Sequence, residues 1–203
     1  MVNITSNIPK HRKIIFEGDS LTEYGTAMLP GARTLKTNVQ TSILAIPKVA
    51  NVFDYSLAGT QLDELLTRIN TWIYQVNEGD IIHIWCGTND IKNGGFTGAQ
   101  TYARLLLCTA PLIAKGAKIC VATMIASDKV GDPVDIETNR LAYNALIRTG
   151  GFHAVADIGA DPVFDAQTDC HNGTYYHTDF RHLVTSGITT ASTISYNAIA
   201  ALL

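Results

Sequence analysis

The sequence lacks the features that mark several common protein classes. Lys and Arg number only 15 among 203 residues, they are scattered along the chain, and the net charge is −3, so no basic surface for nucleic acid is expected. No segment reaches the roughly 18 consecutive apolar residues of a membrane helix, and residues 1–13 have no apolar core of a secretory signal. We therefore expect a soluble protein with no membrane span and no nucleic-acid partner.

Cysteine is also sparse, and its spacing excludes further classes. The chain has no CxxC pair, and neither a disulfide framework nor a zinc cluster is expected of its four widely separated cysteines, Cys86, Cys108, Cys120 and Cys170. The compartment stays open, because both a cytoplasmic protein and a domain of a larger secreted or virion-surface protein fit this composition. The oligomeric state is equally open.

The residues that are present suffice for one domain. Hydrophobic residues make up 46% of the chain, and 203 residues can bury a substantial core. The sequence has no internal repeat and no long linker. We expect residues 1–13 to form an N-terminal extension and residues 14–203 to form a single domain.

Apolar runs alternate with segments of helical periodicity. In 61–77, apolar residues recur every three or four positions and predict one buried helical stripe. Strands that alternate with helices favour a parallel sheet covered on both faces, so we expect three layers, helix on sheet on helix. The predicted strands are 13–17, 49–56, 80–86, 117–124 and 153–159, and the predicted helices are 35–45, 61–77, 98–115, 136–149 and 186–203.

Residues able to do chemistry follow the predicted strands, where open parallel sheets form their sites. The stretch IIFEGDSLTEYG, residues 14–25, passes from an apolar run directly into glycine, aspartate and Ser20. Gly59 follows the second strand, GTND (87–90) follows the third, and DFRH (179–182) precedes the last helix. An ordinary turn or helix cap would explain any one of these clusters alone. Their joint order is much less expected by chance.

In these four blocks the chain resembles the SGNH hydrolases, also called the GDSL esterase and lipase family. GDSL (18–21) matches the first block, Gly59 the second, GTND (87–90) the third, and Asp179 with His182 the last, so the likeness runs from residue 14 to the C-terminus. The resemblance implies a flavodoxin-like three-layer α/β/α sandwich with a central five-stranded parallel sheet. It also implies ester hydrolysis that needs no metal and no organic cofactor.

Two blocks depart from the family pattern. The family commonly has glycine and an apolar residue between its Asp and His, where this chain has Phe180 and Arg181. The second block often has asparagine before its glycine, and here the run is YSLAG (55–59). Neither departure removes a catalytic atom. Arg181 is a candidate substrate-binding residue, because it could alter the charge that a substrate meets.

Three of the matched residues could together activate a hydroxyl group. A serine hydroxyl is a poor nucleophile at neutral pH unless a neutral imidazole accepts its proton. We expect His182 to serve Ser20 in this way, with Asp179 orienting the imidazole and stabilising the imidazolium. The resemblance further implies an oxyanion hole formed by the backbone N–H groups of Ser20 and Gly59 and the side-chain amide of Asn89.

Several neighbouring residues admit two interpretations. Tyr175 and Tyr176 could line an acyl or sugar pocket, or could belong to the core. His171 and His177, with Asp169 and His182, could ligate a metal ion, but they lack a fixed spacing or a cysteine partner, so a solvated polar loop is favoured and no metal site is expected. Structural roles are expected for three further residues, Asp19, Asp90 and the strand histidine His83.

Taken together, the residues and the resemblance favour a serine esterase acting on short-chain esters. Among the substrates that the resemblance implies, we expect acetyl groups on carbohydrate. The sequence has no long apolar lid, and the loops after the first and third strands are short. A lipase or thioesterase of the same family and a non-catalytic carbohydrate-binding module on this fold are the alternatives. A flavodoxin-like nucleotide binder would need a Gly-rich phosphate loop, which GDSLTEYG (18–25) does not provide.

Overall fold

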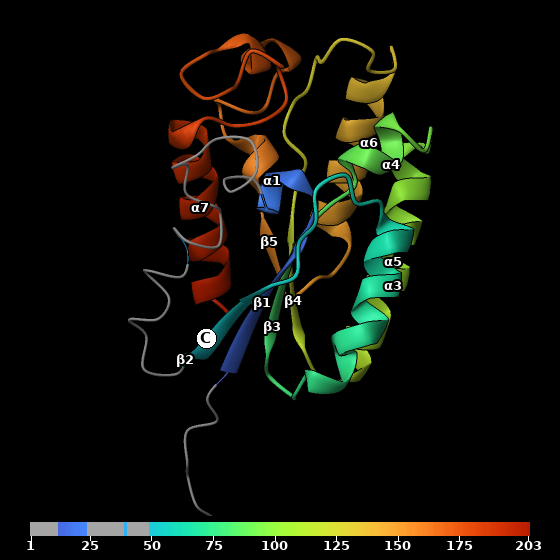
Figure 1. Ribbon diagram of the computed structural model, residues 1–203, viewed down its shortest axis with the longest axis vertical. Coiled ribbons are helices and arrows are strands. Elements are labelled where there is room, and N and C mark those ends of the chain that lie inside the picture. Colours follow the sequence, from blue (N-terminus) through green and yellow to red (C-terminus); the bar gives the residue numbers. More distant parts are fainter. Residues whose placement is uncertain (1–11, 24–38, 40–48) are drawn as a thin grey trace, which may run out of the picture.

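The computed structural model describes residues 12–23, 39 and 49–203, and a parallel β-sheet of five strands lies at their centre (Figure 1). The strand order is β2-β1-β3-β4-β5, which is the order of the flavodoxin-like sandwich that the resemblance implies. The register places Phe16 of β1 beside Asp54 of β2 and His83 of β3. The strands are β1 (Arg12–Gly18), β2 (Val49–Asp54), β3 (Ile81–Trp85), β4 (Lys118–Ala122) and β5 (Ala154–Ala156).

Helices cover both faces of this sheet, so the expected three layers are present. Figure 1 shows α7 along one face and α3, α5 and α6 along the other. Strand side chains alternate between the two cores: Ile14 and Phe16 pack with the residues of α7, whereas Ile15 packs with those of α3 and α5. The helices are α1 (Ser20–Glu23), α3 (Leu62–Trp72), α4 (Thr88–Lys92), α5 (Gly98–Ala114), α6 (Ile136–Thr149) and α7 (Thr185–Ala200), with 3₁₀ turns η1 (Ile73–Gln75), η2 (Ile158–Ala160) and η3 (Gln167–His171).

Most of the predicted elements are confirmed. The first four strands begin and end within two residues of the predicted bounds, and the helices predicted at 61–77, 98–115, 136–149 and 186–203 are present. The predicted strand 153–159 is shorter than expected, because the N–H of Gly159 donates to the Thr123 hydroxyl (2.8 Å) and the chain turns into η2. The predicted helix 35–45 lies outside the described residues except for Val39.

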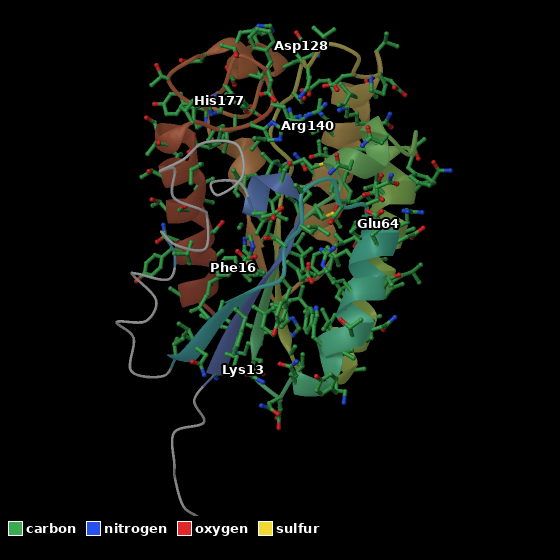
Figure 2. The ribbon with its side chains drawn as sticks, viewed as in Figure 1. Lys13, Phe16, Glu64, Asp128, Arg140 and His177 are labelled. Atoms are coloured by element: carbon green, nitrogen blue, oxygen red, sulfur yellow. The ribbon has the colours of Figure 1, made fainter. Side chains whose placement is uncertain are left out.

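The carboxyl ends of the strands and the loops that follow them gather at one end of the molecule. Figure 2 labels Asp128 and His177 in the loops at this end and Lys13 at the opposite end. In the ranges 12–23 and 49–203, none of the helices has the length and apolar character needed to cross a bilayer. The loop-bearing end is therefore the place to look for a site.

Candidate active site

Ser20 stands at the junction of β1 and the short helix α1. The backbone N–H of Asp19 donates to the Trp85 carbonyl (3.3 Å), and its carboxylate accepts from the N–H of Leu21 (2.9 Å). Gly18 allows this close approach, because a Cβ atom there would lie only 2.3 Å from the Trp85 carbonyl oxygen. The sharp turn leaves Ser20 as the first residue of α1, only partly buried.

The structure brings Ser20, His182 and Asp179 together in a line, although 162 residues separate the serine from the histidine. Ser20 Oγ lies 3.0 Å from His182 Nε2, and His182 Nδ1 lies 2.5 Å from Asp179 Oδ2. This is the nucleophile, base and carboxylate order that activates a serine hydroxyl. The sequence-predicted trio thus has the geometry that its expected chemistry needs.

The last block is a tight turn, and one of its residues is left-handed at a position where the family commonly has glycine. Phe180 has φ of 55°, a left-handed conformation that glycine adopts more readily than any other residue. The turn is held by Asp179 Oδ1, which accepts from the backbone N–H of His182 (3.0 Å) and of Arg181 (3.3 Å). The Phe180 ring lies 4.3 Å from that of His171, a contact that glycine could not make.

Charges in the trio favour a neutral imidazole beside a carboxylate. Burial lowers the pKa of His182, and Asp179 only partly opposes that effect, so the pKa stays below its ordinary value. Burial acts to raise the pKa of Asp179, but hydrogen bonds from His182 outweigh it and hold the pKa well below the usual range. At neutral pH His182 can therefore accept a proton, and Asp179 is ionised.

Gly59 and Asn89 lie together at the carboxyl ends of the neighbouring strands. Gly59 occupies a turn closed by the Thr60 N–H and the Leu57 carbonyl (3.2 Å), with φ of 81°. The Leu57 N–H in turn donates to the Gly18 carbonyl (3.1 Å), which ties this turn to the end of β1. Asn89 Nδ2 donates to the Thr60 carbonyl (3.2 Å). Two of the residues expected in an oxyanion hole are thus held in one hydrogen-bonded unit that is linked to the strand before Ser20.

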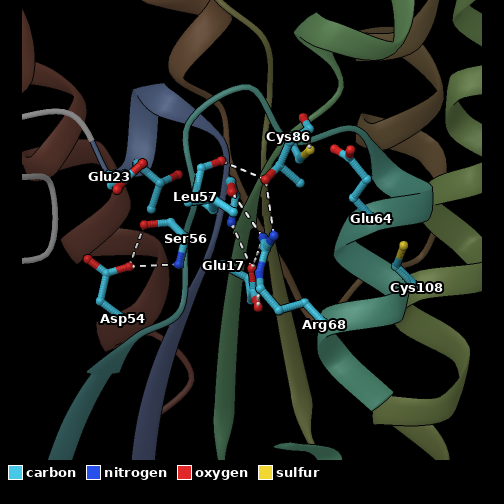
Figure 3. A network of polar contacts seen from close by, with 12 residues as sticks. Glu17, Glu23, Asp54, Ser56, Leu57, Glu64, Arg68, Cys86 and Cys108 are labelled. Atoms are coloured by element: carbon cyan, nitrogen blue, oxygen red, sulfur yellow. Dashed lines mark hydrogen bonds and ion pairs between the residues drawn. The ribbon is translucent and has the colours of Figure 1, made fainter. Parts of the chain in front are cut away.

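An ion pair around the buried carboxylate of Glu17, which sequence reasoning missed, is hydrogen-bonded to the turn that holds Gly59 (Figure 3). Glu17 is completely buried in β1, and Arg68 of α3 pairs with it at 2.7 Å. Arg68 also donates to the Thr60 hydroxyl (3.0 Å) and the Gly18 carbonyl (3.3 Å). The signal in the sequence was the carboxylate at the end of an otherwise apolar strand, IIFE (14–17). Arg68 therefore connects the strand that precedes Ser20 to the Gly59 turn.

The buried carboxylates of the first and third blocks have structural contacts. Asp90 accepts from the backbone N–H of Leu62 at the start of α3 (3.1 Å) and from Arg104 Nε (2.9 Å). Burial raises the pKa of Asp90 to about 6 and that of Asp19 to about 7. Asp19 therefore carries only part of a negative charge behind Ser20 near neutral pH.

Two of the residues expected to contact substrate are placed elsewhere. The Arg181 side chain is buried, and it is bonded to Ser127 Oγ (3.0 Å) and to the carboxylate of Asp132. The Tyr176 side chain is also buried, and its ring packs edge-on against Phe164. Tyr176 therefore belongs to the core. Neither residue is retained as a substrate contact.

The remaining aromatic and histidine candidates have other surroundings. Tyr175, which is half-buried, also packs edge-on against Phe164 and stays a prediction as a pocket residue. His171 pairs with Asp128 at 2.8 Å. No three His, Cys, Asp or Glu side chains converge on a metal-sized site in the described part of the chain.

Known structures share this arrangement of strands and helices. No family model and no curated protein matches the sequence. TesA superposes with a TM-score of 0.73 at 18% identity, covering 95% of this chain and all of the other. A member of the lipolytic G-D-S-L family from Veillonella parvula gives 0.71 at 19% identity, covering 93% of this chain and 98% of the other. The chain has the fold of the SGNH hydrolases. An acetylxylan esterase from Geobacillus stearothermophilus, solved as a catalytic mutant, shares that SGNH fold with a TM-score of 0.69 at 16% identity over 95% of both chains.

Proposed function

We propose that this SGNH-fold chain is a serine esterase that hydrolyses carboxylic esters through an acyl-serine intermediate. One observation carries the proposal: Ser20 Oγ, both nitrogens of His182 and Asp179 Oδ2 form a continuous hydrogen-bonded line, with separations of 3.0 and 2.5 Å. A nucleophile, a neutral base and an orienting carboxylate are the three parts that acyl transfer by serine requires.

The reaction follows from these contacts in two stages. His182 Nε2 accepts the hydroxyl proton as Ser20 Oγ attacks the ester carbonyl carbon, and Asp179 stabilises the imidazolium that forms. His182 then gives the proton to the leaving alcohol when the ester C–O bond breaks. A water molecule, deprotonated by His182, attacks the acyl-serine, and the proton returns to Ser20 Oγ as the carboxylic acid leaves.

The charge that develops on the carbonyl oxygen needs hydrogen-bond donors. The backbone N–H groups of Ser20 and Gly59 and the Nδ2 amide of Asn89 are the proposed donors. A Cβ built on Gly59 would meet no other atom within 4 Å, so substrate can approach this turn closely. Asn89 Nδ2 uses one bond to hold the Thr60 carbonyl and has a second hydrogen left to donate.

For the substrate, we propose a short acyl group, acetyl above all, carried on carbohydrate. The fold likeness to an acetylxylan esterase agrees with this choice, and GTND forms the start of α4 without a long apolar insertion. A lipase or acyl hydrolase for longer chains is the second candidate, because a lipase/acylhydrolase from Enterococcus faecalis shares the fold with a TM-score of 0.70 at 19% identity.

The test is release of p-nitrophenol from acetyl, butyryl and octanoyl esters, followed by acetate release from acetylated xylan. Ser20→Ala should abolish turnover, and the matched control Ser186→Ala, on the exposed first turn of α7, should leave it unchanged. Activity that falls steeply from acetyl to octanoyl supports the acetyl esterase, and the opposite order supports the long-chain hydrolase. Equal activity in wild type and Ser20→Ala would refute the serine mechanism, and glycan binding without turnover would support the binding-module alternative.

A further inference from the structure

The loop that follows β4 is hydrogen-bonded to the turn that carries Asp179 and His182. Arg181, between those two residues, donates through Nε to Ser127 Oγ (3.0 Å) and pairs with Asp132. Ser127 Oγ donates to Asp132 as well (2.8 Å), which closes a buried triangle of two loop residues and one arginine. The position of the last block therefore depends on this loop.

Lys129, in the same loop, contacts Asp179 itself. Its Nζ lies 3.1 Å from Asp179 Oδ2, which is the oxygen that also accepts from His182 Nδ1. The other oxygen, Oδ1, is occupied by backbone N–H groups of the turn. Lys129 and His182 thus share one carboxylate oxygen, and each contact weakens the negative charge available to the other.

The positive charge of Lys129 opposes protonation of His182 in two ways. It repels an imidazolium directly, and it takes part of the Asp179 charge that would stabilise one. Among the described residues, other charges near His182 include those of its own turn, Asp179 and Arg181, and Arg181 is balanced by Asp132. From α4, Lys92 interacts electrostatically with Lys129 and Asp179. From beside Ser20, Asp19 interacts with Arg181. Within this set, Lys129 is the cation bonded to the carboxylate that His182 uses.

We propose that Lys129 is a positioning residue that acts on His182 through Asp179 and keeps the imidazole unprotonated in mildly acidic solution. The inference rests on the proposed esterase function, because it concerns the base of that reaction. Its consequence is an activity that persists at lower pH than Ser20, His182 and Asp179 alone would allow. The side chains of Lys129 and Asp179 are 35% and 29% exposed, so water weakens the effect without removing it.

Neutralising Lys129 tests this inference through the pH profile. In Lys129→Met the pKa of His182 should rise, so the acid limb of kcat/KM for p-nitrophenyl acetate should move up by about 0.5 to 1 pH unit. At a pH well below both limbs, activity relative to the plateau should fall about 3- to 10-fold. Lys129→Arg, which keeps the charge, should restore most of the wild-type profile. Lys115→Met, at the exposed end of α5, removes one positive charge elsewhere and should not move the limb.

A purely structural role for Lys129 predicts a different pattern. Loss of loop order alone would lower kcat at every pH without moving the limb, and thermal unfolding would show a lower midpoint for Lys129→Met. An unmoved limb in Lys129→Met, or equal displacement in Lys129→Arg and Lys129→Met, would overturn the inference.

A second readout keeps this test separate from the test of the esterase. NMR titration of the His182 imidazole in wild type and Lys129→Met measures its pKa whether or not any ester is hydrolysed. Absence of Ser20-dependent hydrolysis would defeat the proposed function and leave this titration interpretable. Normal hydrolysis with the same His182 titration in both proteins would defeat only the role of Lys129.

Discussion

Replacing Arg68 by methionine should destabilise the protein far more than removal of an ordinary surface charge. The side chain of Glu17 is fully buried, and its carboxylate accepts from Arg68 Nη2 (2.7 Å), Arg68 Nε (3.2 Å), Trp72 Nε1 (3.1 Å) and the backbone N–H of Gly18 (3.2 Å). The variant removes the two charged donors and leaves the carboxylate buried with the two neutral ones. Breaking one side of a buried pair typically costs 3–5 kcal/mol, and the remaining Trp72 and Gly18 bonds favour the low end, about 3 kcal/mol at pH 7.

The pH dependence of that loss identifies its cause. Burial raises the pKa of Glu17 above 4.5 even with Arg68 present, and removal of Arg68 raises it further. A carboxyl group whose folded pKa is raised contributes stability that is present below its unfolded pKa and lost as the pH rises through the folded pKa. The destabilisation of Arg68→Met should therefore be larger at pH 8 than at pH 5, where Glu17 more readily becomes neutral.

Urea unfolding at pH 5 and pH 8 measures both quantities. Glu17→Gln combined with Arg68→Met should recover most of the loss, because the double variant buries no charge. The matched control is Arg148→Met, whose partner Asp157 is 38% exposed, and it should cost less than about 1 kcal/mol. An Arg68→Met loss below about 1 kcal/mol at pH 8, or one that does not shrink at pH 5, would refute the reasoning.

Three further predictions address the proposed oxyanion donor, the strained turn and the buried histidine. Asn89→Ala should lower kcat about 100- to 1,000-fold with little change in KM, and kcat within tenfold of wild type would remove Asn89 from the site. Phe180→Gly should be about 1 kcal/mol more stable in urea than Phe180→Ala, since both lose the ring and only alanine keeps the left-handed strain; equal stabilities would argue against that strain. Burial lowers the pKa of His83 to about 3, so the unfolded chain binds a proton first and stability falls as the pH drops from about 6.5. Urea unfolding should show wild type losing about 1.6 kcal/mol more than His83→Leu between pH 6.5 and pH 5, and parallel losses would contradict the prediction.

Much of the fold follows from patterns that the sequence displays directly. Apolar runs and helical periodicity predicted the parallel sheet and its helices because burial on both faces requires those patterns. The expected meeting of Ser20 with His182 depended on the rule that strand ends and their loops share one edge of a sheet. That rule places the sequence blocks at one edge but does not give the orientation of their side chains. The 3.0 Å contact between Ser20 Oγ and His182 Nε2 could therefore be seen only in the structure.

The errors and omissions have a common physical source. Arg181 was a candidate for substrate binding and Tyr176 was left open between a pocket and the core, and both side chains are buried. Proximity in sequence to the last block does not say which way a side chain points in a tight turn. His83 was expected to have a structural role, and it is fully buried with neither ring nitrogen bonded to any described residue. Lys129 carries no motif, and its contact with Asp179 joins residues 50 apart. Such long-range polar pairs leave no periodic signal.

The central claim, that Ser20 is the nucleophile activated by His182, is tested most directly by covalent labelling. The protein is incubated with a p-nitrophenyl alkylphosphonate, and intact mass and peptide mapping locate the adduct. The account predicts one phosphonyl group per chain on Ser20, absent in Ser20→Ala and formed at least 100-fold more slowly in His182→Ala. No adduct on Ser20, or equally fast labelling in His182→Ala, would contradict it.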